Sequence, residues 1–184
     1  MRVRLIAGEF GGRKLDSPRG RGTHPMGERI RNALFNSIQH ELPGATVLDA
    51  FAGTGALGLE ALSRGAAHAT FVESGRIAQK VIANNIETLG LDEDRAKLVR
   101  SRVNAWISTN PDAQFDIIFV DPPYYAIEQH FSTIERLFGL LKPGALMVLS
   151  KPGKCEEVIA NDEIVVVDNR SYSQANLTFY RRKM

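Results

Sequence analysis

Short runs of apolar residues alternate with helical stretches from Thr46 onward. The apolar runs cover residues 46–50, 69–73, 97–101, 115–121, 145–150, 163–168 and 177–181. Between the earlier runs, apolar residues recur at helical spacing in 57–63, 75–89 and 127–141. Near-continuous apolar strands separated by helices indicate an α/β fold with a parallel sheet covered on both faces. Because no long helix separates the last two runs, we expect an antiparallel C-terminal hairpin at one edge of a seven-stranded sheet.

The first part of the chain has a different pattern. In residues 1–23, Val3 and Leu5 alternate with polar residues and Gly11-Gly12 indicates a turn, so we expect a small β-hairpin. Apolar residues three and four positions apart predict a helix over 24–42, which Pro43-Gly44 ends. The sequence therefore predicts an N-terminal extension at 1–42 and a larger domain at 43–184.

Charge is distributed unevenly along the chain. Residues 1–31 hold eight Lys and Arg against three acidic residues, whereas the remainder holds 15 against 18. A basic segment on a mildly acidic body indicates a polyanionic partner, and a solvated charged face is the alternative. The candidate phosphate contacts are Arg2, Arg4, Arg13, Lys14, Arg29 and Arg31.

Cysteine and histidine usage excludes several kinds of site. A single cysteine, Cys155, excludes an internal disulfide and a cysteine-based metal site. The four histidines are scattered without metal-ligand spacing, so we expect no metal. No apolar run approaches the ~20 residues of a membrane span, and the first residues lack a secretory signal. We expect a cytoplasmic protein with no membrane partner.

A glycine-rich segment follows the first strand of the predicted sheet. Gly53, Gly55 and Gly58 spell GxGxxG, a pattern that dinucleotide sites share. Asp49 stands four residues before the first glycine. A carboxylate there would repel a pyrophosphate and suits a ligand with a cationic amino or sulfonium group. A tight strand-to-helix turn with a capping acid is the alternative.

Two further positions fit a nucleoside ligand. Glu73 ends the second strand, where an acid can accept both ribose hydroxyls. The alternative for Glu73 is an acid placed at a helix N-terminus. After the third strand, Asn104 is a candidate for contact with the adenine amino group, and Arg102 is the other candidate by spacing.

The tetrapeptide after the fourth strand is Asp121-Pro122-Pro123-Tyr124. Two prolines hold the backbone extended and remove two amide donors. The Pro122 carbonyl and the Asp121 carboxylate can then accept both hydrogens of an exocyclic amine, and Tyr124 can stack on the base. A turn without a catalytic role is the alternative.

The glycine segment resembles that of class I S-adenosylmethionine methyltransferases, and the tetrapeptide resembles the signature of their amino-methylating members. The segments 4–8, 12–15, 28–36, 49–65 and 119–124 together resemble the RsmD family of 16S rRNA guanine-N2 methyltransferases. The resemblance implies a Rossmann-like fold and methylation of one guanine N2 in 16S rRNA, within an assembled or assembling small ribosomal subunit. It implies catalysis by residues 121–124. Separately from the resemblance, we expect a monomer. The implied S-adenosylmethionine contacts are Asp49, Phe51, Ala52, Gly53, Gly55, Glu73, Asn104 and Asp121.

Three other functions compete with this one. A DNA or RNA adenine-N6 methyltransferase uses the same tetrapeptide, but such DNA enzymes usually add a target-recognition domain that this length cannot accommodate. A non-catalytic RNA-binding assembly factor would not need Asp121, Glu73 and the glycine segment intact. A NAD-dependent oxidoreductase would need a residue pair for hydride chemistry, and none is evident.

Overall fold

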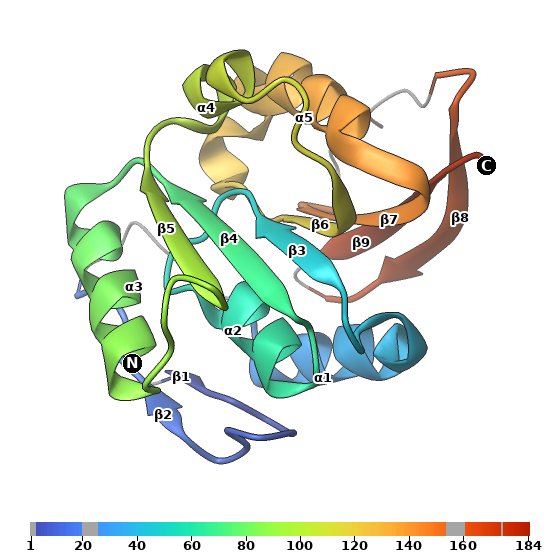
Figure 1. Cartoon of the computed structure of the whole chain (residues 1–184). Coiled ribbons are helices and arrows are strands. Elements are labelled where there is room, and N and C mark those ends of the chain that lie inside the picture. Colours follow the sequence, from blue (N-terminus) through green and yellow to red (C-terminus); the bar gives the residue numbers. More distant parts are fainter. Residues whose placement is uncertain (1–2, 20–25, 154–160, 174) are drawn as a thin grey trace.

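The computed structural model describes residues 3–19, 26–153, 161–173 and 175–184. Within them a seven-stranded sheet has helices on both faces, and a two-stranded hairpin lies beside it (Figure 1). The hairpin and sheet strands are β1 (Val3–Arg4), β2 (Lys14–Leu15), β3 (Thr46–Asp49), β4 (His68–Glu73), β5 (Ala96–Arg100), β6 (Phe115–Val120), β7 (Leu141–Lys151), β8 (Ile164–Ser171) and β9 (Asn176–Arg182). The α-helices are α1 (Glu28–Ser37), α2 (Ala56–Ser63), α3 (Arg76–Thr88), α4 (Val103–Thr109) and α5 (Phe131–Leu137).

The sheet has the strand order β5-β4-β3-β6-β7-β9-β8. Strands β3 to β7 pair in parallel, and β9 pairs antiparallel with both β7 and β8. The expected mostly parallel sheet with an antiparallel C-terminal hairpin is confirmed. Because β3 lies between β4 and β6, the strand order reverses there, and ligands of such sheets bind beyond the carboxyl ends at this point.

Successive residues of the central strands are buried on opposite faces of the sheet, in two separate hydrophobic cores. Val47 of β3 packs into the core that contains α1, α2 and α3, whereas Leu48 packs into the core that contains α4 and α5. Phe119 and Ile118 of β6 divide in the same way. Burial on both faces explains why these strands are almost continuously apolar in sequence.

Several element boundaries differ from the sequence prediction. Helix α1 covers Glu28–Ser37 and a 3-10 turn, η1, follows at Gln39–Glu41. The helix expected over 127–141 is divided into η2 (Tyr124–His130), α5 and η3 (Phe138–Leu140). Helix α4 was not predicted from the sequence; it has only seven residues and buries two of them. Strand β7 begins at Leu141, before a register shift at its pairing with β6.

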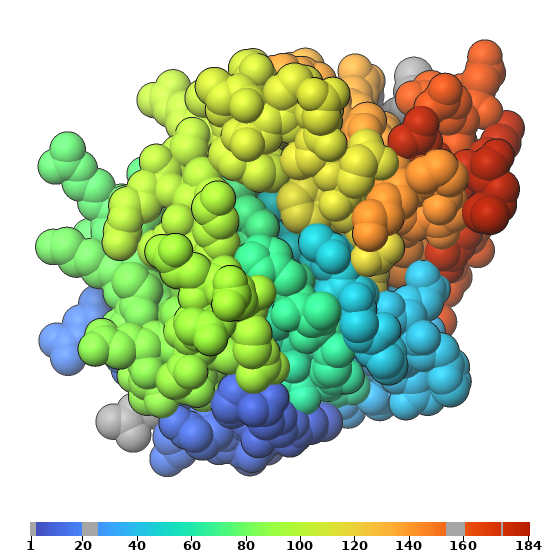
Figure 2. All heavy atoms as spheres, in the orientation of Figure 1, coloured from blue at the N-terminus to red at the C-terminus, as the bar shows by residue number. Residues whose placement is uncertain are grey.

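The N-terminal hairpin packs into the body of the protein. Val3, Leu5, Phe10 and Leu15 are buried and belong to the core cluster that α1, α2 and the sheet share. Figure 2 shows the N-terminal atoms, in blue, directly against the surface of the body. The chain turns as expected, since the Leu5 amide donates to the Arg13 carbonyl and the Gly12 amide to the Leu5 carbonyl. Residues 3–19 therefore share a core with α1, α2 and the sheet, and a domain boundary between residues 42 and 43 stays a prediction.

A buried carboxylate on α2 joins this hairpin to the helices. Glu60 is fully buried and accepts hydrogen bonds from the Ile6 amide at 2.9 Å and the Ala7 amide at 3.2 Å. Its other partners are Arg64, whose Nε lies at 2.8 Å, and Arg31, whose Nε lies at 4.0 Å. A buried charge is stable only when it is paired and hydrogen-bonded, and Glu60 meets both conditions.

We expect Glu60→Ala to lower the free energy of unfolding by about 3 to 5 kcal/mol, because it leaves buried cations and amides without their acceptor. Urea unfolding followed by circular dichroism measures this change. The exposed ion pair of Glu9 with Arg95 provides the control, and Glu9→Ala should stay within about 1 kcal/mol of wild type. Equal losses in the two variants would contradict the role of Glu60.

Candidate active site

The carboxyl ends of the central strands bring the predicted site residues to one edge of the sheet. Asp49 ends β3, Glu73 ends β4, and Asp121 directly follows β6. Strand β3 pairs with both neighbours, so the three carboxylates lie on adjacent strands. The structure therefore unites the glycine segment, Glu73 and the tetrapeptide in one place.

Each glycine of the segment after β3 has its own structural reason. Gly53 and Gly55 have φ angles of +57° and +79°, a region that favours glycine. A Cβ on Gly58 would lie 2.3 Å from the Phe71 ring, so only glycine permits this approach of α2 to β4. A Cβ on Gly53 would meet nothing within 4 Å, which leaves open space above the loop.

Glu73 fixes the position of the glycine segment. Its carboxylate accepts hydrogen bonds from the Gly53 amide at 2.8 Å and the Gly75 amide at 2.7 Å. Each carboxylate oxygen has two acceptor sites, so these bonds leave capacity for hydroxyl donors. The proposed ribose contact is compatible with this arrangement and stays a prediction.

Asp49 is almost fully buried and only partly satisfied. Its Oδ2 accepts from the Gly58 amide at 3.0 Å, while Oδ1 is buried without a hydrogen-bond partner. Burial raises the pKa of Asp49 to about 8, the Gly58 amide opposes the shift, and the charges of Asp121 and Glu73 add to it. A cationic donor at Oδ1 would satisfy the orphaned oxygen and favour the ionised form.

The Asp121-Pro122-Pro123-Tyr124 segment leads directly from β6 into η2. Burial raises the pKa of Asp121 to about 6, and a hydrogen bond from Ser150 partly opposes this shift. Tyr124 is half-buried, and its hydroxyl lies 2.6 Å from the Ser150 hydroxyl on β7. Burial also raises the pKa of Tyr124 to about 12, so the phenol keeps its proton.

Two other predicted cofactor contacts have partners in neighbouring elements. The Phe51 ring contacts His130 of η2 edge-on, with centroids 4.9 Å apart, so the glycine segment touches the segment after the tetrapeptide. Asn104, at the start of α4, accepts a hydrogen bond from Arg136 of α5 through its side-chain oxygen. The contact of Asn104 with adenine stays a prediction.

The basic N-terminal residues divide into exposed and buried members. Lys14 and Arg29 are exposed, as are Arg4, which pairs with Glu28, and Arg13, which donates to the Thr88 carbonyl. Arg31 is only 1% exposed and donates to the carbonyls of Met26 and Arg4. The prediction that Arg31 contacts phosphate is therefore wrong, because the side chain serves the packing of α1. Arg2 lies outside the described residues.

Asn85 of α3 links the N-terminal segment to the glycine segment. It is 2% exposed, and its Nδ2 donates to the Thr54 carbonyl and to the Asp16 carbonyl, both at 3.1 Å. Its Oδ1 accepts from the Asp16 amide at 2.8 Å. A buried asparagine inside a helix has no recognisable sequence motif, so the sequence analysis missed it.

Ser150 is the second site residue that the sequence analysis missed. It stands near the carboxyl end of β7, where the rule that found Asp49 and Glu73 would also have found it. The polar residue at the end of the apolar run 145–150 was the available signal.

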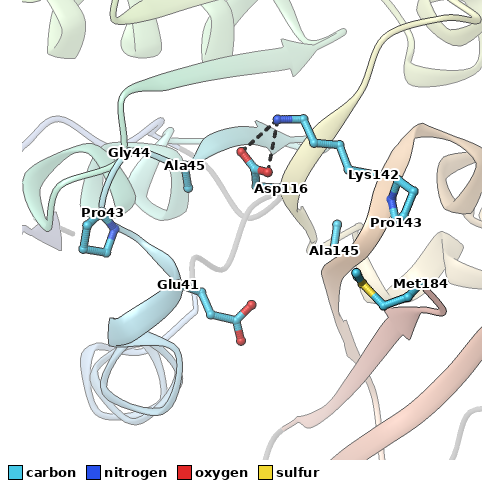
Figure 3. Close-up of a pocket in the computed structure, with 10 residues that line it drawn as sticks. Glu41, Pro43, Gly44, Ala45, Asp116, Lys142, Pro143, Ala145 and Met184 are labelled. Atoms are coloured by element: carbon cyan, nitrogen blue, oxygen red, sulfur yellow. Dashed lines mark hydrogen bonds and ion pairs between the residues drawn. The ribbon is translucent and has the colours of Figure 1, made fainter.

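A cavity of about 500 Å³ lies at the amino ends of the central strands, opposite the carboxyl ends that hold the candidate site (Figure 3). Its lining includes Ala45 before β3, Asp116 at the start of β6, and Lys142. Asp116 accepts from the Lys142 ammonium and from the Thr46 amide at 2.8 Å. None of the predicted site residues that the structure describes lines this cavity.

The described part of the chain contains neither a candidate metal cluster nor a candidate membrane-spanning helix. No group of three or more His, Cys, Asp and Glu in residues 3–19, 26–153, 161–173 and 175–184 could hold a metal ion. Over the same ranges, no helix is long and apolar enough to cross a bilayer.

The relatives of this chain among known proteins include rRNA methyltransferases from two bacteria. The model of the family described as conserved hypothetical protein 95 matches residues 3–181. Ribosomal RNA small subunit methyltransferase D of Haemophilus influenzae is 35% identical over 152 residues, which are 79% of this chain and 76% of that protein. The protein of the same name from Escherichia coli K12 is 40% identical over 122 residues, which are 66% of this chain and 60% of that protein.

A solved structure has the same fold. The Escherichia coli protein yhhF, a proposed methyltransferase, has a TM-score of 0.84 and 31% identity to this chain. The superposition covers 100% of this chain and 99% of that protein. The extent of the match includes the N-terminal hairpin as well as the sheet.

Proposed function

The chain belongs to the conserved hypothetical protein 95 family, and we propose that it methylates the exocyclic N2 amine of a guanine in 16S rRNA. The resemblance to the RsmD family is confirmed by this membership and by the names of the relatives. The chain is therefore an rRNA methyltransferase of Rossmann-like fold. The observation that supports an exocyclic amine as the methylated group is the position of the Asp121-Pro122-Pro123-Tyr124 segment beside the glycine segment.

The residues at the carboxyl edge fit S-adenosylmethionine. The buried Asp49 Oδ1 lacks a partner and suits the amino group of the methionine part. The open space above Gly53 gives that part access to the loop backbone of residues 51–55, and Glu73 retains acceptor capacity for ribose hydroxyls. When bound, S-adenosylmethionine supplies an electrophilic methyl group on a sulfonium.

Asp121 and its neighbours would hold the guanine amine toward that methyl group. The Asp121 carboxylate and the Pro122 carbonyl accept the two amine hydrogens, and the ring of Tyr124 stacks on the base. The nitrogen lone pair, held in this way, would accept the methyl group that S-adenosylmethionine supplies, and the sulfur would keep the electron pair of the bond that it loses. The nitrogen next loses one proton, and Asp121, whose pKa is raised to about 6, is placed to accept it and pass it to water.

Exposed cations of the N-terminal segment support an RNA partner. Arg4, Arg13, Lys14 and Arg29 lie on the hairpin and α1, and phosphate contacts of this kind position an RNA without reading its sequence. The relatives' names refer to small-subunit rRNA, which supports the same substrate here. Action on an assembled or assembling subunit, as a monomer in the cytoplasm, remains part of the proposal.

We expect cofactor binding to release nearly one proton at pH 7. Asp49 is mostly protonated there because its pKa is raised to about 8, and a cationic amino group at Oδ1 would ionise it. Affinity should accordingly increase as pH rises toward 8. Calorimetric titration in buffers of different ionisation enthalpy measures the released proton. Asp49→Asn should bind without releasing it, and zero release by wild type would contradict this contact.

The reaction itself is tested by mass spectrometry of nucleosides. We expect N2-methylguanosine after incubation of the purified chain and S-adenosylmethionine with small ribosomal subunits or naked 16S rRNA. Asp121→Ala should lose at least about a hundredfold in rate, since the amine loses its charged acceptor, while calorimetry shows cofactor binding retained. N6-methyladenosine would instead favour the adenine-specific alternative, and no methylated nucleoside would favour a non-catalytic assembly factor.

The proposed RNA contacts are tested by salt dependence. Log affinity falls as log salt rises, and each lost phosphate contact should make this slope less steep by roughly 0.7 to 0.9. The double variant Lys14→Ala/Arg29→Ala should therefore flatten the slope measured by filter binding. Lys183→Ala, at an exposed position near the C-terminus, is the control. An unchanged slope in the double variant would mean that these two cations form a solvated face.

A further inference from the structure

Ser150 lies directly beside the catalytic carboxylate. In the parallel pairing of β6 and β7, Val120 is the partner of Leu149. Asp121 and Ser150 are each the next residue, so Asp121 leaves β6 beside Ser150, which is still within β7. Ser150 is 1% exposed, which excludes bulk water from its hydroxyl.

The Ser150 hydroxyl bonds to two residues of the catalytic segment. It lies 2.6 Å from the Tyr124 hydroxyl, and a hydrogen bond from it lowers the pKa of the neighbouring Asp121 carboxyl. An ionised carboxylate only accepts, and a serine hydroxyl has one proton to donate. Ser150 must therefore donate to Asp121 and accept from Tyr124, which gives the hydrogen bonds one direction, from Tyr124 through Ser150 to Asp121.

We propose that Ser150 is a positioning residue for methyl transfer, which orients the Asp121 carboxylate and the Tyr124 ring together toward the target amine. This inference rests on the proposed function. One carboxylate oxygen is occupied by Ser150, so the other is turned toward the amine. The same hydroxyl anchors the far end of the Tyr124 side chain, so the ring face is fixed before the base arrives.

The groups around Asp121 give the sign of the pH effect. Asp49 of β3 and Tyr124 of η2 face it, and Glu73 of β4 interacts with Asp49. Burial raises the pKa of Asp121, and the Ser150 hydrogen bond lowers it. Loss of the Ser150 hydroxyl therefore raises the pKa further. Since the ionised carboxylate accepts the amine, the acidic limb of the rate profile should move to higher pH.

The variants Ser150→Ala and Ser150→Thr test this inference in steady-state kinetics. We expect Ser150→Ala to reduce kcat about tenfold to a hundredfold, as for a lost hydrogen bond to a charged group, with the KM for S-adenosylmethionine unchanged. Its acidic limb should lie at higher pH than that of wild type. Ser150→Thr keeps the hydroxyl and should restore both.

Thr178→Val is the matched control for loss of a buried hydroxyl. Thr178 is 3% exposed on β9, and its hydroxyl has no hydrogen-bond partner. The isosteric valine breaks no bond, so kcat and the pH profile should stay as in wild type. Loss of kcat in Thr178→Val equal to that in Ser150→Ala would mean that any change in this core lowers the rate, and would overturn the inference.

Carbon-13 NMR titration of the Asp121 carboxyl gives a readout that needs no RNA. The resonance is assigned by its disappearance in Asp121→Asn. We expect its pKa to be higher in Ser150→Ala than in wild type. An unchanged pKa together with wild-type kcat would overturn the role of Ser150. The Asp121 pKa could be raised in Ser150→Ala while the wild-type protein methylates neither small ribosomal subunits nor naked 16S rRNA. That result would support the hydrogen bonds of Ser150 and reject the proposed function.

Discussion

Burial of carboxylates at one edge of a parallel sheet is the constraint on which the site depends. Asp49 and Asp121 leave adjacent strands, and burial raises the pKa of each. In isolation such an arrangement is costly, because ionised Asp49 lacks solvation, Asp121 is only partly solvated, and the two charges repel each other. A cationic group at Asp49 and an amine at Asp121 would remove part of that cost. The part of the cost that the two ligands remove would contribute to the free energy of their binding.

The N-terminal segment is tied to the same framework. Glu60 holds the hairpin backbone against α2, and Asn85 bonds both Asp16 and the carbonyl of Thr54 in the glycine segment. The segment that supplies the exposed cations is therefore joined to the segment proposed to hold the cofactor. A free basic arm would leave its cations without a defined position relative to the cofactor. This packing instead fixes the exposed cations relative to the glycine segment.

The sequence predicted the sheet and its edge because both follow from local patterns. Apolar runs such as 115–121 identify strands buried on both faces, and their following residues identify the site. Tertiary packing decided the features that were missed. A charge count cannot show that Arg31 is buried, and the short helix α4 has too few turns for a periodic signal. Asn85 acts through neighbours that are remote in sequence, so no motif contains it. Ser150 could have been found from its place at the end of the apolar run 145–150, but its contact with Tyr124 depends on the fold.

A crystal structure with S-adenosylhomocysteine bound tests the central claim most directly. We expect the amino group of the product within hydrogen-bond distance of Asp49 Oδ1, the ribose hydroxyls on Glu73, and the sulfur facing the segment of Asp121 and Pro122. Product bound instead in the cavity beside Asp116 and Lys142, or at the carboxyl edge without contact to Asp49 and Glu73, would contradict the account.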